Sequence, residues 1–417
     1  MERVVVTGLG LVAPNGTGRE EFWQALLEGR PGIGAVGFST AGGRSFYGGE
    51  VKDFNPLNYM PAHRAAKMGR SSQLALAAAR LALEDAGLSP SRIKRCNTGL
   101  VLGTTMGESQ VGSHLVDSYC LHGDGFSRPG MMGRFIRRST AFSIASHLAT
   151  DLDLPGPVLT VPTACAAGNY AVAHAYDLIR DGECRVMLAG GVDSFSQVAF
   201  YGFKRIFALA PERCQPFDLH RKGLIVSEGA AVLVLESMES ALMRGAPVVA
   251  EVLGYGMGCD AHHMTVPHPT GLGAVLAMKT AMKMAGLATG DVDYISAHGT
   301  GTRANDEVET RAIKSVFGPL AYQVPVSSIK SMIGHTMGAA SAIEALTCCL
   351  AVSRDFIPPT INYEEPDPEC DLDYVPNHPR WRPVRVAMSN AYAFGGNCSS
   401  LLVGKFYAGG KRQWAGR

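Results

Sequence analysis

The sequence predicts an α/β fold built from two related halves. Segments typical of strands and of helices alternate along the 417 residues, as they do in α/β proteins. The chain also repeats one order of elements, helix, strand, strand, helix, strand, on each side of residue 245. Such a repeated order indicates a duplicated unit. We therefore expect one half over residues 1–245 and a second half over residues 246–417.

The repeated order starts in each half with a helix rich in alanine. These helices cover residues 74–86 and 274–285, and Gly87 and Gly286 follow them where a left-handed C-cap is expected. The other elements are the strands 98–102, 158–162 and 185–189 with the helix 166–180, and the strands 293–297, 324–328 and 385–389 with the helix 338–352. Only the first half has an inserted region, at about 105–142, for which we expect a lid or a dimer surface.

Composition argues against several classes of protein. Charged residues make up 18% and hydrophobic residues 46% of the chain, which favours a large core and surface hidden at a subunit interface. The net charge of +1 gives no general reason to expect binding to nucleic acid or to a membrane. No window approaches the ~18 apolar residues of a membrane span. The ten cysteines are irregularly spaced, so we expect mostly reduced core residues and a cytoplasmic protein.

Cys165 is the candidate nucleophile. It lies between an apolar strand and an alanine-rich helix, so we expect it at a helix N-terminus, where the partial positive charge favours the thiolate. Its neighbours Ala164, Ala166 and Gly168 are small and leave room for a substrate carbonyl. The backbone N–H of Cys165 is placed to face a developing oxyanion. The alternative, a buried structural cysteine, is not excluded by this segment alone.

Two histidines strengthen the case for catalysis. His298 follows the strand 293–297, and His335 follows the strand 324–328. In open α/β sheets, residues just beyond the carboxyl ends of strands meet at the ligand crevice. Since Cys165, His298 and His335 all have such positions, we expect them to form one site.

These motifs resemble those of the elongating β-ketoacyl–acyl carrier protein synthases, which belong to the thiolase-like condensing enzymes. The resemblance covers about residues 3–405 and is carried, besides Cys165, by the segments 4–10, 217–218, 227–230, 298–302, 330–335 and 393–396. It implies a thiolase-like fold, a layered αβαβα sandwich of two halves, usually found as a homodimer. It also implies an acyltransferase that joins an acyl group to malonyl–acyl carrier protein by decarboxylative Claisen condensation, in fatty acid or polyketide chain elongation.

The resemblance also assigns roles to residues near the predicted site, and it implies no metal and no organic cofactor. Cys165 matches the acylated nucleophile, and His298 and His335 match the pair that promotes malonyl decarboxylation and stabilises the enolate. Lys330 matches a lysine that holds positions and tunes the protonation of the histidines. Glu344 matches its buried carboxylate and is also expected among the substrate-binding residues. A purely structural pairing of Lys330 with Glu344 is an alternative, and the two roles are compatible.

Three further residues match positions that contact substrate in the family. Thr300 and Thr302 match the threonines that contact the pantetheine arm. Phe394 matches the gating aromatic residue, whose backbone N–H helps to form the oxyanion hole. All three lie in the segments that carry the resemblance.

The acyl pocket is less firmly defined. Met106 matches the far end of the pocket, and Phe200 and Tyr201 lie where its walls are expected, although all three also suit a plain core. Two features depart from the family: residues 397–398 read Asn-Cys where Thr-Asn is usual, and Glu108 replaces a small residue. These departures leave a specialised polyketide or polyene pathway as an alternative to fatty acid synthesis.

The expected partner is an acyl carrier protein, which is typically acidic, so its docking surface is expected to be basic. Three basic groups are candidates, although each also suits an ordinary solvated surface: His63, Arg64, Lys67 and Arg70; Lys204 and Arg205; and Arg137 and Arg138. The protein is expected to form a homodimer, or a heterodimer with a related subunit.

Other functions remain as alternatives. Residues 8–13 fit a loose dinucleotide-binding fingerprint, but Pro14 and Asn15 interrupt the helix that this function requires. A non-catalytic, chain-length-determining partner subunit would typically lack the nucleophile that Cys165 supplies. A thiolase, or a priming synthase that uses coenzyme A thioesters, would be expected to differ at one of the two histidines.

Overall fold

The computed structural model describes residues 2–39, 45–122, 133 and 138–407. Its main sheet contains β1 (Val4–Ala13), β2 (Gly16–Thr17), β5 (Gly99–Gly103), β6 (Val158–Val161), β7 (Val186–Asp193), β8 (Gly229–Ser237), β9 (Ala250–Cys259), β10 (Tyr294–Ser296), β11 (Val326–Ser327), β14 (Val386–Tyr392) and β15 (Asn397–Gly404). β3 (Gly34–Ser39) and β4 (Ser45–Gly48) pair as a small antiparallel hairpin, and β12 (Phe356–Ile357) and β13 (Arg380–Trp381) form a separate two-stranded sheet.

The strand order shows the duplication directly. The sheet runs β11-β10-β14-β15-β9-β1-β8-β7-β5-β6, so each half contributes five strands in one arrangement, and the halves meet where β9 pairs with β1. The three outermost strands of each half are parallel, and the remaining pairs are antiparallel. Together with the solved structures described below, this confirms the predicted fold class. The boundary predicted near residue 245 lies between α10 (Met238–Met243) and β9.

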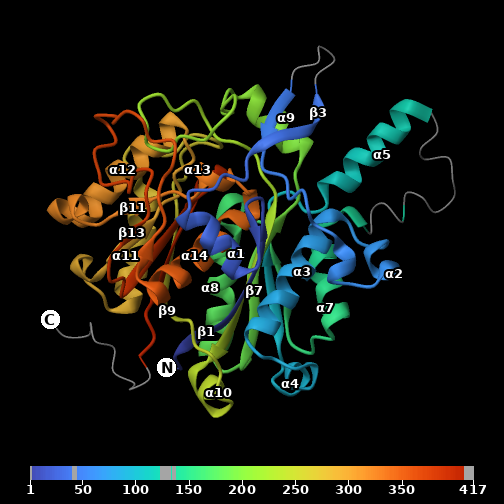
Figure 1. The fold of residues 1–417 in the computed structure, drawn as a ribbon. Coiled ribbons are helices and arrows are strands. Elements are labelled where there is room, and N and C mark those ends of the chain that lie inside the picture. The colour runs from blue at the N-terminus through green and yellow to red at the C-terminus, as the bar shows by residue number, and fades with distance from the viewer. Residues whose placement is uncertain (1, 40–44, 123–132, 134–137, 408–417) are drawn as a thin grey trace.

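The helices cover the sheet in layers. Besides α10, the described helices are α1 (Arg19–Leu27), α2 (Ala62–Ala65), α3 (Arg70–Asp85), α4 (Pro90–Arg95), α5 (Ser109–His122), α7 (Ala141–Leu152), α8 (Ala167–Arg180), α9 (Gln197–Arg205), α11 (Leu272–Ala285), α12 (Arg303–Phe317), α13 (Lys330–Ile333) and α14 (Ala340–Arg354). In Figure 1, α3 and α7 lie on one side and α11 and α12 on the other, with α8 and α14 between them. Gly87 and Gly286, which follow α3 and α11, have positive φ angles of 63° and 67°, as expected.

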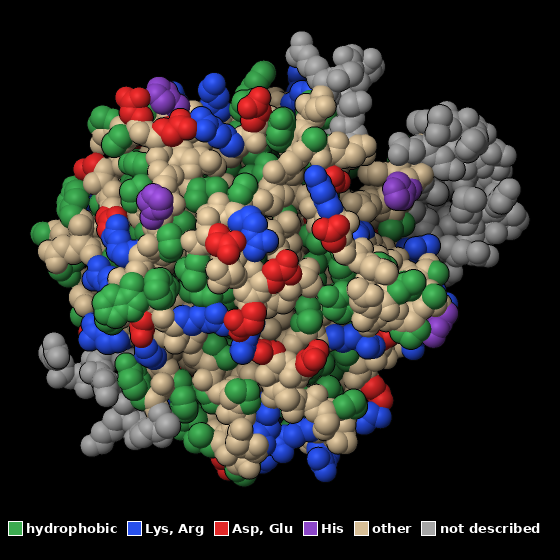
Figure 2. All heavy atoms as spheres, in the orientation of Figure 1, with side chains coloured by type: hydrophobic (Ala, Val, Ile, Leu, Met, Phe, Trp, Pro, Cys, Tyr) green, Lys and Arg blue, Asp and Glu red, His purple; other side chains and the backbone are tan. Residues whose placement is uncertain are grey.

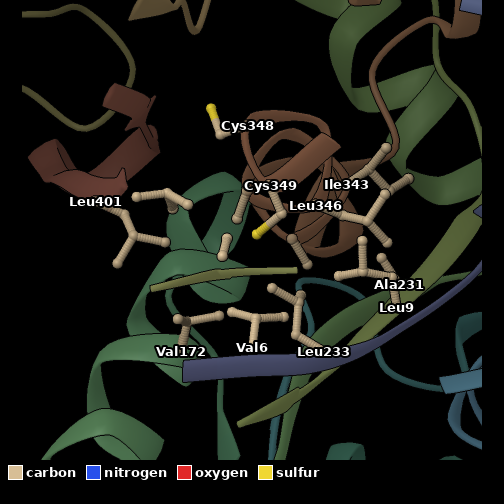
Figure 3. Packing of buried hydrophobic residues seen from close by; sticks show 14 of the residues in the cluster. Val6, Leu9, Val172, Ala231, Leu233, Ile343, Leu346, Cys348, Cys349 and Leu401 are labelled. Atoms are coloured by element: carbon tan, nitrogen blue, oxygen red, sulfur yellow. The ribbon is translucent and has the colours of Figure 1, made fainter. Parts of the chain in front are cut away.

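The central helices are buried because their sequences are apolar on nearly all sides. Every residue of α14 from Ala340 to Val352 is buried, which is typical of a helix enclosed by other layers. Figure 3 shows Ile343 and Leu346 of this helix packed near Val172 of α8 and Leu233 of β8. This packing places the N-termini of α8 and α14 in the middle of the molecule.

The inserted region adds α5, which projects from the body in Figure 1 and contacts α9. Arg134 and Arg137 lie outside the described residues, whereas Arg138 is exposed. A role of this region as a lid or a dimer surface stays a prediction. On the face drawn in Figure 2, Lys and Arg side chains are interspersed with Asp and Glu. Among the described residues, no helix has the length and apolarity that a membrane crossing requires.

The glycines of the first strand serve helix packing. Gly10 lies within β1, and a Cβ added to it would come within 2.1 Å of the carbonyl oxygen of Ala78 in α3. The strand continues to Ala13 and turns into β2, and α1 begins only at Arg19. The segment that fits a loose dinucleotide fingerprint is therefore a central strand in close contact with a helix.

We predict that Gly10→Ala destabilises the fold by roughly 2–3 kcal/mol, because the added methyl group forces α3 away from the sheet. Gly202→Ala in α9 is the matched control, since a Cβ there has no neighbour within 4 Å. The measurement is the urea midpoint of each variant. Equal midpoints for the two variants would show that α3 does not need this close approach.

Candidate active site

Cys165 lies at the start of the first central helix. It is in a short 3₁₀ turn, Ala164–Ala166, which connects β6 to α8. Ala164 has a φ of 49°, a conformation that is uncommon for a residue with a side chain and that occurs at functional sites. The side chain of Cys165 is buried but lines a cavity. The structure thus places the thiol at the helix N-terminus that the sequence predicts.

The cavity brings together most of the predicted site residues. It encloses about 660 Å³ including its open mouth, and it lies between the two halves of the chain. Its wall includes Cys165, His298, Thr300, Thr302, His335 and Phe394. The rings of His298 and His335 are 5.5 Å apart and nearly perpendicular. Three chain segments that are far apart in sequence therefore form one site.

His335 is held as a hydrogen-bond donor. The backbone N–H of Met337 donates to its Nδ1 over 3.1 Å, so in the neutral ring the proton is on Nε2. Burial and the positive charge of Lys330 keep the pKa of His335 well below 6.5. The pKa of His298 is also well below 6.5, because of burial and the nearby Lys330 and His335. Both rings are therefore neutral at physiological pH.

The backbone of His298 is fixed from two sides. Its N–H donates to the carboxylate of Glu309, which also accepts the N–H of Gly299. Its carbonyl oxygen accepts a hydrogen bond of 2.7 Å from Nζ of Lys330. Lys330 is in turn paired with Glu344, and both are buried. Removing one partner of a buried pair is costly, so this arrangement gives His298 a rigid position.

The thiol of Cys165 differs from the sequence prediction in its acidity. Burial raises its pKa to about 12, and the positive charge of Lys330 only partly opposes this effect. The helix N-terminus was expected to favour the thiolate. The expectation was wrong in direction, because the sequence does not reveal how completely the sulfur is removed from water.

The remaining cavity residues include a pair of hydroxyl groups and an aromatic ring at the mouth. The hydroxyl groups of Thr300 and Thr302 are 2.9 Å apart on the cavity wall. Phe394 is 39% exposed, lies at the mouth and contacts Phe203 with ring centroids 5.5 Å apart. Gly395, next to Phe394, has a φ of 84° and donates to the carbonyl of Met264. The loop that carries Phe394 is therefore tied to the opposite side of the mouth.

Three predicted site residues lie behind the cavity wall. Lys330 and Glu344 are not part of the wall, and they influence the site through the backbone of His298. Glu344 is thus misplaced as a substrate-contacting residue, because its carboxylate faces Lys330 inside the protein. Met106 packs into a neighbouring apolar cluster with Phe200. Tyr201 is exposed, so it does not form a pocket wall.

Glu108, one of the two departures from the family pattern, has a structural role. Its carboxylate accepts hydrogen bonds from the backbone N–H groups of Ser71 and Ser72, in the first turn of α3. A carboxylate at a helix N-terminus satisfies free N–H groups and complements the helix dipole. The other departure, Cys398, is buried and contributes to the cavity wall.

Sequence reasoning missed three residues that shape the site. Asp193 at the end of β7 accepts hydrogen bonds from Thr104, Thr105, Met106 and Gly338, and so joins the two halves. Its place at a strand end was a usable signal. Glu309 on α12 and Tyr392 on β14, whose ring is 5.8 Å from that of His298, gave no such signal.

The comparisons with known proteins agree with this geometry. Residues 1–241 match the family profile "Beta-ketoacyl synthase, N-terminal domain", and residues 249–364 match "Beta-ketoacyl synthase, C-terminal domain". The chain is 41% identical over 414 residues to 3-oxoacyl-[acyl-carrier-protein] synthase 2 of Synechocystis sp. (strain ATCC 27184 / PCC 6803 / Kazusa), covering 97% of this chain and 98% of that protein.

Solved structures give the same result. The ishigamide ketosynthase/chain length factor superimposes with a TM-score of 0.92 at 43% identity, over 97% of this chain and 100% of that one. A type II PKS ketosynthase, in a structure with its acyl-carrier protein, superimposes with a TM-score of 0.88 at 33% identity, over 97% and 100% of the two chains. The two domain matches, the similarity along the chain and the shared fold show that this protein belongs to the beta-ketoacyl synthase family.

Proposed function

We propose that the protein is a β-ketoacyl–acyl carrier protein synthase in which Cys165 carries the growing acyl chain. The observation that carries this proposal is the single cavity formed by Cys165, His298 and His335. A thiol exchanges one thioester for another at little thermodynamic cost. The first half-reaction moves the acyl group from the carrier thiol to the Cys165 sulfur and releases the free carrier thiol.

Proton transfer must accompany this first step. Since burial raises the pKa of Cys165 to about 12, the thiol has to lose its proton as the new bond forms. His298 is the neutral group that suits this role, because its Nδ1 has no hydrogen-bond partner among the described residues. His335 is unsuited, because its Nδ1 already accepts the N–H of Met337.

The second half-reaction forms the carbon–carbon bond. Malonyl–acyl carrier protein loses carbon dioxide, and the electron pair of the broken bond gives an enolate on the thioester oxygen. His335 presents Nε2–H as a donor, so it can stabilise that oxyanion without being charged. The enolate carbon then attacks the acyl carbonyl on Cys165, and the C–S bond breaks. The Cys165 sulfur takes up a proton from water, which restores the thiol, and a carrier-bound β-ketoacyl product leaves.

The same cavity argues for an active enzyme over a non-catalytic partner subunit. A chain-length-determining subunit needs neither the thiol of Cys165 nor two neutral histidines beside it. Because one similar structure is a ketosynthase/chain length factor, a heterodimer with such a subunit is an alternative to a homodimer. A cytoplasmic location is supported by the nine cysteines whose side chains the structure describes, which are all free.

Docking of an acidic carrier protein requires basic residues that are not already paired within the fold. Arg70 is bound to Glu228 and to the carbonyl of Val51, so it is better explained by a structural role. Lys67 and Arg205 are exposed. Arg205 is also close in sequence to Ala208, which lines the cavity. We therefore propose Lys67 and Arg205 as contacts of the carrier.

Incubation with a panel of acyl–acyl carrier protein thioesters should add the mass of the acyl group to the native protein. Cys165→Ala should abolish the adduct completely, because no other sulfur has the same position at the start of α8. Cys259→Ala, which removes an exposed thiol, is the control and should keep the adduct. Intact mass spectrometry makes the measurement, and an adduct on Cys165→Ala would refute the assignment.

Malonyl decarboxylation should tolerate mild acid, because the pKa values of His298 and His335 lie well below 6.5. Lys330→Ala removes a positive charge that lowers the pKa of both histidines, so both pKa values should rise. As the pH falls, the variant should therefore lose activity at a higher pH than the native protein does. The pH profile of carbon dioxide release measures this shift, with Lys283→Ala on the surface of α11 as control. If the acidic side of the pH profile lies at the same pH in Lys330→Ala as in the native protein, Lys330 does not lower the pKa of the histidines.

Charge reversal at the proposed docking residues should weaken carrier binding. Lys67→Glu and Arg205→Glu should each raise the KM for carrier-bound substrate about threefold to tenfold, since an exposed charge pair contributes roughly 1 kcal/mol. Lys283→Glu is the control for the general effect of charge. Steady-state kinetics with the acyl carrier protein decide the matter, and unchanged KM values in both variants would exclude this surface.

A further inference from the structure

An acyl chain on Cys165 needs apolar space beside the thiol. One part of the cavity wall, Phe203 and Leu224, also belongs to an adjoining apolar cluster. The cluster consists of Val36, Phe195, Ala199, Phe200, Leu224, Val226 and Met337, with Phe46, Met106, Phe203 and Leu209 packed against it. We call this set the acyl-end cluster. It is an apolar region that directly continues the cavity wall.

Two members of the acyl-end cluster have side chains that can yield. Met106 and Met337 are unbranched and flexible, so they can move aside for a chain that enters between them. Their backbones are firmly held: Met106 N–H donates to Asp193, and Met337 N–H donates to His335. Side chains can therefore rearrange while the loops near the thiol stay in place.

The outer end of this cluster is closed by a hairpin that the proposed mechanism does not use. Phe46 of β4 lies against Phe200, with ring centroids 4.8 Å apart. Nζ of Lys204 lies 4.5 Å from the centre of the Phe46 ring, so the ammonium group covers one side of that ring. Val36 of β3 belongs to the cluster as well.

The hairpin itself is well anchored beside the cluster. Gly49, directly after β4, donates its N–H to the carbonyl of Val226 over 3.0 Å. At Gly48 there is no room for a side chain, since a Cβ would come within 2.5 Å of Phe195 and of Val36. Phe46 is therefore held against the cluster by the hairpin backbone, unlike the flexible methionines inside it.

We propose that Phe46 is the outer stop of the acyl site and limits the length of chain that Cys165 can carry. This inference rests on the proposed function, because it requires that Cys165 is acylated. A growing acyl chain would push the flexible methionine side chains aside until it reaches the fixed ring of Phe46. Phe46 is a specificity-determining residue in this view and takes no part in the chemistry.

The test is the longest acyl chain that each variant accepts from a graded series of saturated acyl–acyl carrier proteins, read by intact mass. Phe46→Ala should accept chains longer by about two to four carbons, because the truncation removes a volume of several methylene groups. Phe46→Trp keeps an aromatic ring and should accept only shorter chains. Tyr47→Ala is the matched control, because Tyr47 is the next residue on β4, is 37% exposed and points to the other face.

Each outcome has a definite meaning. Opposite shifts in Phe46→Ala and Phe46→Trp, with native behaviour in Tyr47→Ala, support the inference. If native protein is acylated but both Phe46 variants keep its limit, or if Tyr47→Ala shifts the limit as Phe46→Ala does, Phe46 is not the stop. If the native protein accepts no chain at all, the proposed function fails, and this inference fails with it.

Discussion

The close approach of the two central helices at their N-termini is the constraint on which the rest of the structure depends. A Cβ on Gly168 of α8 would lie 2.3 Å from the backbone nitrogen of Ala342 of α14, so only glycine permits this contact. The hydroxyl of Ser341 accepts the N–H of Asn169 across the same junction. Cys165 precedes one helix and His335 precedes the other. The contact therefore brings the nucleophile and the oxyanion donor into one cavity.

Buried charged groups give this junction its precision. Asp193 holds the loop after β5 and the start of α14 together, and Glu309 and Lys330 hold the turn at His298. Burial raises the pKa of both Glu309 and Glu344 to about 7, because the interior disfavours their charges. Such groups remain in place only when they are well hydrogen-bonded, and the bonds that satisfy them also fix the donors that face the cavity.

The separation between a rigid catalytic centre and a softer apolar extension follows from the same packing. Near Cys165, Asp193 accepts the backbone N–H of Met106, and the backbone N–H of Met337 donates to His335. The acyl-end cluster, in contrast, is made of apolar side chains that include two methionines. Main-chain hydrogen bonds thus hold the groups around the thiol in place, whereas the proposed limit on chain length depends on side-chain packing. Glu108 belongs to the rigid part, because it caps α3, so this departure from the family pattern gives no information about the acyl group.

The sequence by itself determined the repeated order of elements, the position of Cys165 before a helix and the gathering of two histidine motifs at strand ends. These features depend on local periodicity and on the direction of parallel strands. Only the tertiary structure decided that Lys330 and Glu344 lie behind the cavity wall, and that the pKa of Cys165 is raised. The role of Glu309 also became visible only there, and so did the contacts that Asp193, at a strand end, makes with both halves. Their roles depend on burial and on contacts between distant segments, such as Asp193 with Gly338, which local sequence patterns do not encode.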